Sequence, residues 1–173
     1  MFGGTKVVHD FESSLSASHS AEDLPIWREI YRIAFPTMQE MINHRQDGDH
    51  QRNGIDRSII LRNSKQILID EKVRFKPYDD ILLEVWSDKQ RRIKGWVCKD
   101  LLCDYISYCI VPLNVCYILP VPQLRVAWQK NAKRWWANYF KPEAINKGWV
   151  TQSVVVPASE LMEEITNAMT VRF

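Results

Sequence analysis

Residues 54–74 read GIDRSIILRNSKQILIDEKVR, in which two runs of apolar residues flank a short polar stretch. The runs Ile55–Leu61 and Ile67–Val73 are rich in β-branched residues and bounded by turn-forming residues, a pattern typical of strands. The polar residues Asn63–Lys65 fall between them, where a turn is expected. The stretch therefore predicts a β-hairpin.

Charged side chains interrupt both strands of this hairpin. Because side chains alternate along a strand, Asp70 and Lys72 should project from one face and Glu71 from the other. Asp56, on the neighbouring strand, can face the same spot as Asp70. Two adjacent carboxylates repel each other, and a hard divalent cation such as Mg2+ or Mn2+ removes that cost by sharing their oxygens. A metal site is predicted, with Lys72 beside it to hold or help deprotonate an attacking water.

The three residues Asp56, Asp70 and Lys72, on consecutive strands after a predicted first helix, resemble the D…(D/E)-x-K pattern of the PD-(D/E)xK nuclease superfamily. The resemblance covers about residues 25 to 119. It implies a restriction-endonuclease-like α/β fold and a Mg2+-dependent endonuclease that hydrolyses phosphodiester bonds of nucleic acid, DNA before RNA. In that mechanism Asp56 and Asp70 hold the metal and Lys72 positions the water. Some members no longer cleave, so the alternative is a non-catalytic nucleic-acid-binding or protein-interaction module with the same fold.

The resemblance also implies a further carboxylate from the first helix. Glu40 is the first candidate for this catalytic position and Glu29 the second, while Glu84 on the next strand is a weaker candidate partner for the metal or for Lys72. The sequence departs from the family pattern at Ile55, where many members have a proline before the first acid.

A second interpretation of the hairpin charges is structural: they can form salt-bridged polar faces on exposed strands. The run Ile67–Ile69 argues against this interpretation, because continuous apolar residues are expected in a central strand that is covered on both faces. Charges at the end of such a strand favour a functional role.

The remaining patterns predict a central mixed β-sheet flanked by helices, in the order αβββαβα with a C-terminal extension. Residues 1–22 are expected to be a flexible arm and residues 23–173 a single nuclease-like domain. The expected elements after the arm are a helix over Pro25–Asn43 kinked at Pro36, the hairpin, a strand over Ile81–Trp86 that completes an antiparallel meander, a helix over Lys99–Ile110, a strand over Val115–Leu119, a helix from about Pro120 to Phe140, a strand over Val154–Val156 and a closing helix over Pro157–Met169.

Basic and polar residues outside the hairpin are candidates for contacting nucleic acid. These candidates are Gln51, Arg52, Arg91, Arg92, Lys133 and Arg134. A solvated loop is the favoured interpretation of Gln51 and Arg52, and it explains Arg91 and Arg92 about as well as contact with nucleic acid. Trp128 and Trp135 lie seven residues apart on one predicted helix, which favours packing in the core over stacking on bases. His50 is a candidate general acid, although an isolated histidine has many other roles.

The composition allows one globular domain and limits what charge can explain. The chain has 173 residues, of which 46% are hydrophobic and 25% charged, and its net charge is only +2. Any surface for nucleic acid must therefore be local rather than a property of the whole protein. A homodimer would place two cutting sites on a duplex, but no residues identify a dimer face.

Four cysteines, at positions 98, 103, 109 and 116, lack the paired C-x2-C spacing of zinc sites. Their apolar neighbours predict small buried hydrophobes. The sequence also shows no secretory signal core and no apolar run long enough to span a bilayer. A cytoplasmic protein with no membrane partner is expected.

Overall fold

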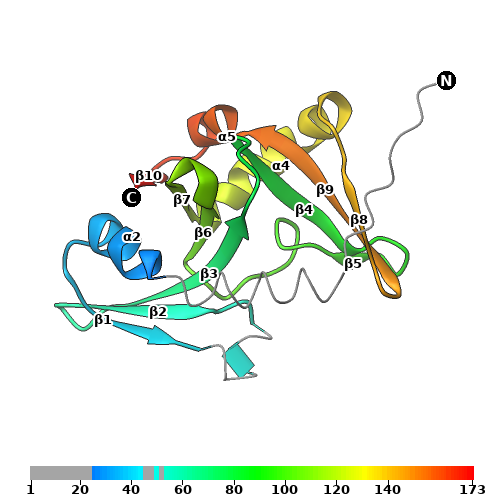
Figure 1. The fold of residues 1–173 in the computed structure, drawn as a ribbon. Coiled ribbons are helices and arrows are strands. Elements are labelled where there is room, and N and C mark those ends of the chain that lie inside the picture. Colours follow the sequence, from blue (N-terminus) through cyan, green and yellow to red (C-terminus); the bar gives the residue numbers. More distant parts are fainter. Residues whose placement is uncertain (1–24, 45–48, 51–52) are drawn as a thin grey trace.

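Two β-sheets and three α-helices form the part of the protein that a computed structural model describes, residues 25–44, 49–50 and 53–173 (Figure 1). The predicted N-terminal arm, residues 1–22, lies outside these described residues. The first sheet has the strand order β1-β2-β3-β6-β7-β10 and the second the order β5-β4-β9-β8. The α/β class and the mixed sheet are therefore confirmed.

The first sheet begins with an antiparallel meander and then changes direction. β2 pairs antiparallel with β1 and β3, while β6 runs parallel to β3 and antiparallel to β7. The predicted hairpin is thus β2 and β3. The strands are β1 (Met38–Asn43), β2 (Arg57–Leu61), β3 (Gln66–Arg74), β6 (Tyr105–Ile110), β7 (Val115–Pro120) and β10 (Met169–Arg172).

The second sheet is antiparallel throughout. Its strands are β4 (Asp80–Asp88), β5 (Ile93–Lys94), β8 (Glu143–Asn146) and β9 (Trp149–Pro157). The predicted third strand forms as β4, but the prediction that it completes a meander with the hairpin is wrong. Both edges of β3 are occupied, one by β2 and the other by β6, so β4 pairs with β9 instead.

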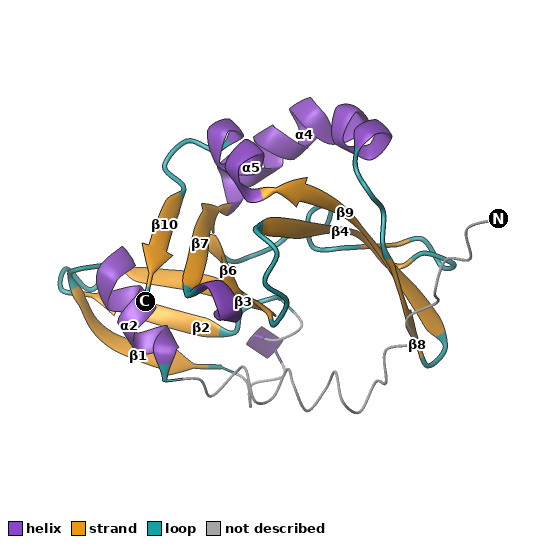
Figure 2. Ribbon diagram, turned by 45° about the horizontal axis from the view of Figure 1, so that its top comes forward, coloured by secondary structure: helices purple, strands orange, loops and turns teal. Residues whose placement is uncertain are grey.

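Helices cover these sheets at two places, as Figure 2 shows. α2 (Ile26–Ala34) lies beside β1 and β10, and its buried residues pack on one face of the first sheet. α4 (Val121–Asn138) and α5 (Ala158–Glu164) lie together against β9. A short 3-10 helix, η1 (Val111–Leu113), joins β6 to β7. Among the helices of the described residues, none is long and apolar enough to cross a membrane.

Three predicted helices are wrong wholly or in part. The first ends at Ala34, because Pro36 lacks the N–H that a helix needs and disfavours helical geometry at Phe35; residues 38–43 form β1 instead. The predicted helix over Lys99–Ile110 is absent. The last helix stops at Glu164, and β10 follows it.

The failure at Lys99–Ile110 has a clear physical cause. Residues 105–110 are aromatic or β-branched at most positions, and all but Tyr105 are buried. They form β6, a strand covered on both faces, whose continuous apolar run cannot be distinguished from a buried helix by periodicity alone. The connection from β3 to β6 is thus made by β4, β5 and a loop rather than by a helix.

Two apolar cores lie on the two faces of the first sheet. One contains α2 together with Ile59 and Ile69, and the other extends to the second sheet, α4 and α5. Trp135 is fully buried in the larger core and Trp128 packs beside it, so the prediction that both belong to the core is confirmed.

Gly95 provides a test of how the β5 turn packs against β4. A Cβ at this position would collide with the backbone carbonyl of Glu84 and lie 2.7 Å from its Cγ. We expect Gly95→Ala to lower the free energy of unfolding by about 1–3 kcal/mol, the usual cost of overpacking. Urea unfolding measures this effect, with Val126→Ala as a control on an exposed helical surface. Equal stability of Gly95→Ala and wild type would contradict the described packing.

Candidate functional site

The structure brings Asp56, Asp70 and Lys72 together on one face of the first sheet. Asp56 lies directly before β2, and its backbone N–H donates a hydrogen bond to the carbonyl of Ile69, 2.9 Å away. This bond continues the antiparallel ladder and sets Asp56 opposite Asp70. Lys72 lies two residues further along β3, and its Nζ is 2.7 Å from Asp70 Oδ1.

The two acids differ in their surroundings. Asp70 is only 3% exposed, on the face that also carries the larger core. Asp56 Oδ2 accepts a hydrogen bond of 2.7 Å from the backbone N–H of Glu71, which fixes one carboxylate oxygen against the neighbouring strand. Asp56 is therefore held by the backbone of β3, whereas Asp70 is held by the side chain of Lys72.

The pKa of Asp70 is raised to about 6. Burial is the largest cause, the nearby Asp56 raises the pKa further, and Lys72 opposes both effects. The Asp70 carboxylate is thus costly to ionise in this position. An added cation would lower that cost by neutralising the repulsion between the two acids.

Lys72 is charged at neutral pH. Burial alone would lower its pKa, but the carboxylates of Asp70, Asp56 and Glu84 raise it above the ordinary value for lysine. Its side chain is 32% exposed, so part of it reaches the surface beside the buried Asp70. The arrangement therefore offers a cation beside the two acids.

Glu84 brings the second sheet to the edge of this site. It lies on β4, and its backbone carbonyl accepts a 3.2 Å hydrogen bond from the N–H of Val97. Burial raises the pKa of its carboxyl group, and the charge of Lys72 opposes this rise only in part. The thiol of Cys103 lies nearby, and burial, with the charge of Asp70, raises its pKa to about 12. Cys103 is thus an uncharged thiol at neutral pH.

Polar side chains continue the site along the same face of β2. The Oγ of the fully buried Ser58 is 2.6 Å from His44 Nε2 and accepts a 2.8 Å hydrogen bond from Gln66 Nε2. The rings of His44 and His50 stack with their centroids 4.1 Å apart. The sequence singled out His50 alone; His44 was missed because its partner Ser58 is recognisable only once β1 and β2 are paired.

The opposite face of the hairpin carries a buried ion pair. Arg57 Nε and Nη2 donate to the two carboxylate oxygens of Glu71 at 2.6 and 3.1 Å, and the Tyr31 hydroxyl donates to the same carboxylate at 2.7 Å. The prediction that Glu71 projects away from Asp70 and Lys72 is confirmed. The alternative of exposed salt-bridged faces does not describe this pair, because both side chains are almost fully buried.

Neither candidate for the additional carboxylate is brought to the site. Glu40 lies on β1 rather than on the first helix, is exposed, and stands opposite Ile60. That position is four residues along β2 from Asp56, or about 13 Å at the rise of a strand. Glu29 is exposed on α2. The predicted helical position of Glu40 is therefore wrong.

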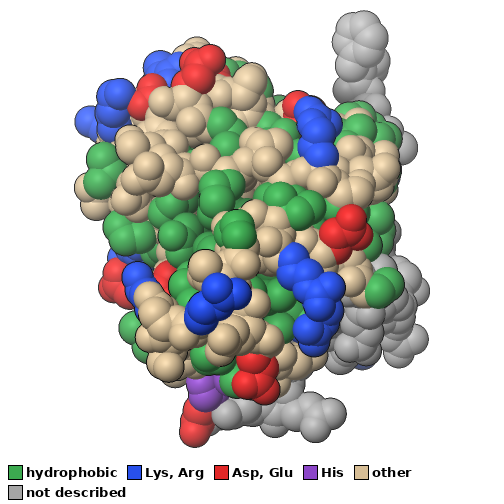
Figure 3. Space-filling view, turned by 90° about the vertical axis from the view of Figure 1, so that its left-hand side faces the viewer, with side chains coloured by type: hydrophobic (Ala, Val, Ile, Leu, Met, Phe, Trp, Pro, Cys, Tyr) green, Lys and Arg blue, Asp and Glu red, His purple; other side chains and the backbone are tan. Residues whose placement is uncertain are grey.

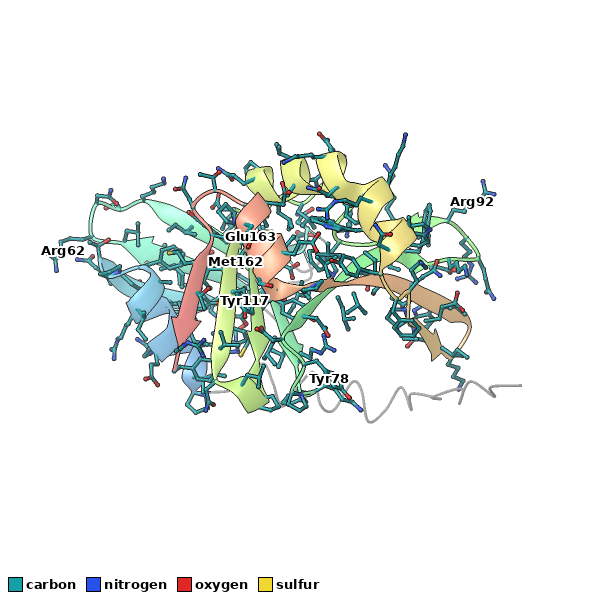
Figure 4. The ribbon with its side chains drawn as sticks, turned by 90° about the horizontal axis from the view of Figure 1, so that it is seen from above. Arg62, Tyr78, Arg92, Tyr117, Met162 and Glu163 are labelled. Carbon is teal, nitrogen blue, oxygen red and sulfur yellow. The ribbon has the colours of Figure 1, made fainter. Side chains whose placement is uncertain are left out.

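The predicted nucleic-acid contacts are dispersed. Gln51 and Arg52 lie outside the described residues. Arg91 pairs with Asp88 at 3.2 Å, and Arg134 with Glu160 at 2.7 Å, so both cations already have acidic partners. Arg92 lies in the β4–β5 turn and Lys133 is exposed on α4. Figure 4 shows Arg92 at the opposite end of the molecule from Arg62 in the β2–β3 turn.

Surface charge gives no broad basic field on the face seen in Figure 3, where basic and acidic side chains are interspersed. This distribution agrees with the small net charge of the whole chain. A polyanion would therefore have to be recognised through local contacts.

The donor set of the site fits a hard divalent cation, although it is small. Within residues 25–44, 49–50 and 53–173, no group of three or more His, Cys, Asp or Glu side chains is arranged to hold a metal ion. Asp56 and Asp70 supply two carboxylates. Mg2+ is commonly bound through one or two carboxylates with water and substrate phosphate completing its shell, so two acids suffice.

Comparison of the chain with protein-family models, with curated proteins and with solved structures gives no match in any of the three.

The titration of Asp70 tests the electrostatics of the site. We expect a midpoint near pH 6 in wild type, followed through the carboxyl carbon by NMR. Asp56→Asn removes a repelling charge and should lower the midpoint, whereas Lys72→Met removes an attracting charge and should raise it. A midpoint that is the same in all three proteins would show that these groups do not interact as described.

Proposed function

We propose that the protein is a Mg2+- or Mn2+-dependent nuclease that hydrolyses phosphodiester bonds of nucleic acid, with DNA favoured over RNA. The observation that carries the proposal is the placement of two carboxylates and a charged lysine on one face of the β2–β3 ladder, with Asp70 almost fully buried. A buried acid whose ionisation is disfavoured by a second acid is a recognised mark of a functional site.

The sheet supports the proposal at a coarser level. The structure has the expected class, with helices packed on a mixed sheet that contains the β2–β3 hairpin. The order αβββαβα that the resemblance implies is not the observed one, because β1 replaces part of the first helix and β6 replaces the helix expected over Lys99–Ile110. The proposal therefore rests on the site rather than on the fold.

Each residue has a distinct part in the proposed reaction. Asp56 and Asp70 would hold the cation, which supplies charge to polarise the scissile phosphate and to lower the pKa of a water. Lys72, charged and partly open to solvent, would donate hydrogen bonds that orient the water or the phosphate. The carboxylates that raise the pKa of Lys72 favour this positioning role.

Location and partners remain part of the proposal. The four cysteines of the described chain are free, which accords with a reducing cytoplasm. Nucleic acid is the proposed partner, approached through Lys72 at the site. A second copy of the chain would be needed only for cutting both strands of a duplex at once.

Cleavage assays test the proposal directly. We expect wild type to cut plasmid, single-stranded DNA or RNA in the presence of Mg2+ or Mn2+ and to be inactive with a chelator. Asp70→Asn should abolish the activity. Lys72→Met should lower the cleavage rate at least about a hundredfold, because a positioned donor that stabilises charge in the transition state commonly contributes that much. Glu40→Gln, which removes an exposed carboxylate away from the site, is the matched control and should remain active.

If well-folded wild type cuts none of these substrates with either metal, the nuclease proposal fails. Metal-independent binding of nucleic acid that survives Asp70→Asn would then favour the non-catalytic binding module.

The proposed metal site also predicts a pH dependence. A proton on Asp70 competes with the cation, and a pKa of about 6 leaves this carboxylate mostly ionised at pH 7 and mostly protonated at pH 5. Mn2+ affinity should therefore fall about tenfold from pH 7 to pH 5. Isothermal titration calorimetry measures the change. Asp70→Asn should bind Mn2+ more weakly and lose the part of the pH dependence that Asp70 causes.

A further inference from the structure

A buried ion pair lies directly behind the proposed metal site. Arg57 and Glu71 make two hydrogen bonds across the β2–β3 ladder, at 2.6 and 3.1 Å. The carboxylate of Glu71 is fully buried and the Arg57 side chain is 6% exposed. Tyr31 of α2, itself fully buried, donates a third hydrogen bond to Glu71. We refer to Arg57, Glu71 and Tyr31 as the rear clamp.

Stability alone gives little reason for such a pair in an apolar core. The rear clamp lies among residues of the smaller core, which includes Ile59 and Ile69. Burying two charges costs on the order of several kcal/mol per ion, and their mutual attraction offsets this cost only approximately. Proteins in which such a pair is replaced by apolar side chains of similar volume are often as stable or more stable. The presence of this pair is better explained by the position in which it holds β2 relative to β3.

The rear clamp acts at the place where the ladder of β2 ends. Arg57 is the first residue of β2 and is paired with Ile69, so Glu71 stands diagonally across from it. Asp56 precedes Arg57, and its backbone is already paired on both sides, because its N–H donates to Ile69 and its carbonyl accepts from the N–H of His44. What the rear clamp can hold is therefore the position of Glu71, to which the side chain of Asp56 is bonded. The bidentate contact ties the end of β2 to the middle of β3, which is in turn paired with β6.

One residue belongs to both faces of this arrangement. The side chain of Glu71 is held by the rear clamp, while its backbone N–H donates 2.7 Å to Asp56 Oδ2 on the site face. Asp56 and Arg57 are covalent neighbours with side chains on opposite faces of the sheet: Asp56 lies on the site face and Arg57 lies in the rear clamp. Movement of Glu71 would therefore displace the carboxylate of Asp56, whose backbone is held separately by Ile69 and His44.

We propose that Arg57, Glu71 and Tyr31 are positioning residues that hold Asp56 against Asp70 and thereby set the cation affinity of the site. The inference rests on the proposed function, since it concerns the same metal site. The hydrogen bond from the Glu71 N–H to Asp56 links the rear clamp to the site. The hydrogen bond from the Tyr31 hydroxyl to Glu71 connects α2 to the same link.

The test replaces the charges by apolar side chains of similar volume, in the double variant Arg57→Met with Glu71→Leu. We expect this variant to remain folded and to bind Mn2+ about ten- to a hundredfold more weakly, as is usual when groups that orient metal ligands are lost. Calorimetry measures the affinity, and urea unfolding verifies that the protein is folded. The matched control, Lys130→Gln with Glu164→Gln, removes an exposed ion pair on α4 and α5 and should bind Mn2+ like wild type.

A second readout does not depend on the metal. The protection factor of the backbone amide at position 71, which corrects for the different side chain, reports its bond to Asp56. This protection should fall in the apolar double variant. Unchanged protection would overturn the inference whether or not the protein binds metal. If wild type binds no Mn2+, the proposed function fails while the exchange result still decides whether the clamp holds Asp56.

Tyr31→Phe provides the test if the double variant does not fold. Removing only the hydroxyl leaves Arg57 and Glu71 paired, so we expect a smaller change in the same direction, about two- to threefold in Mn2+ affinity. If Tyr31→Phe has the Mn2+ affinity of wild type and the same protection of the amide at position 71, the inference is overturned and the ion pair is only structural.

Discussion

The pairing of β2 with β3 is the interaction on which the rest of the structure depends. Its register sets Arg57 against Ile69, and because side chains alternate with a period of two, a slip of one residue would exchange the faces of every charged group in the hairpin. In the observed register Asp70 and Lys72 share one face and Glu71 enters the other. A single strand thereby supports two separate charge arrangements, one partly exposed through Lys72 and one fully enclosed.

The sequence was sufficient to predict this hairpin because both of its signals are local. Apolar runs over Ile55–Leu61 and Ile67–Val73, separated by turn residues, define the strands, and alternation alone assigns Asp70 and Glu71 to opposite faces. Three side chains at fixed positions on two paired strands were thus placed correctly before any tertiary contact was known. α4 and β7 were equally predictable, because prolines at 120 and 122 mark their junction.

What could not be predicted depends on contacts between distant segments. β6 was taken for a helix because a strand buried on both faces shows no alternation, and it was the parallel pairing with β3 that decided its structure. The same pairing occupies the edge that β4 was expected to use. The burial of Arg57 and Glu71 was also out of reach of the sequence, since it depends on α2 covering that face and on Tyr31 meeting the carboxylate.

The electrostatic design of the site follows from this division between the two faces. Behind the sheet, Glu71 is fully compensated by Arg57 and Tyr31, and so it contributes rigidity. In front, Asp56 and Asp70 share one lysine. Burial above all, and then the charge of Asp56, raise the pKa of Asp70, while Lys72 lowers it. A chain with a net charge of +2 has no general attraction for polyanions, so a cation held by these acids would itself be the main positive charge offered to a phosphate. Metal binding and substrate binding at this site would then be a single coupled event.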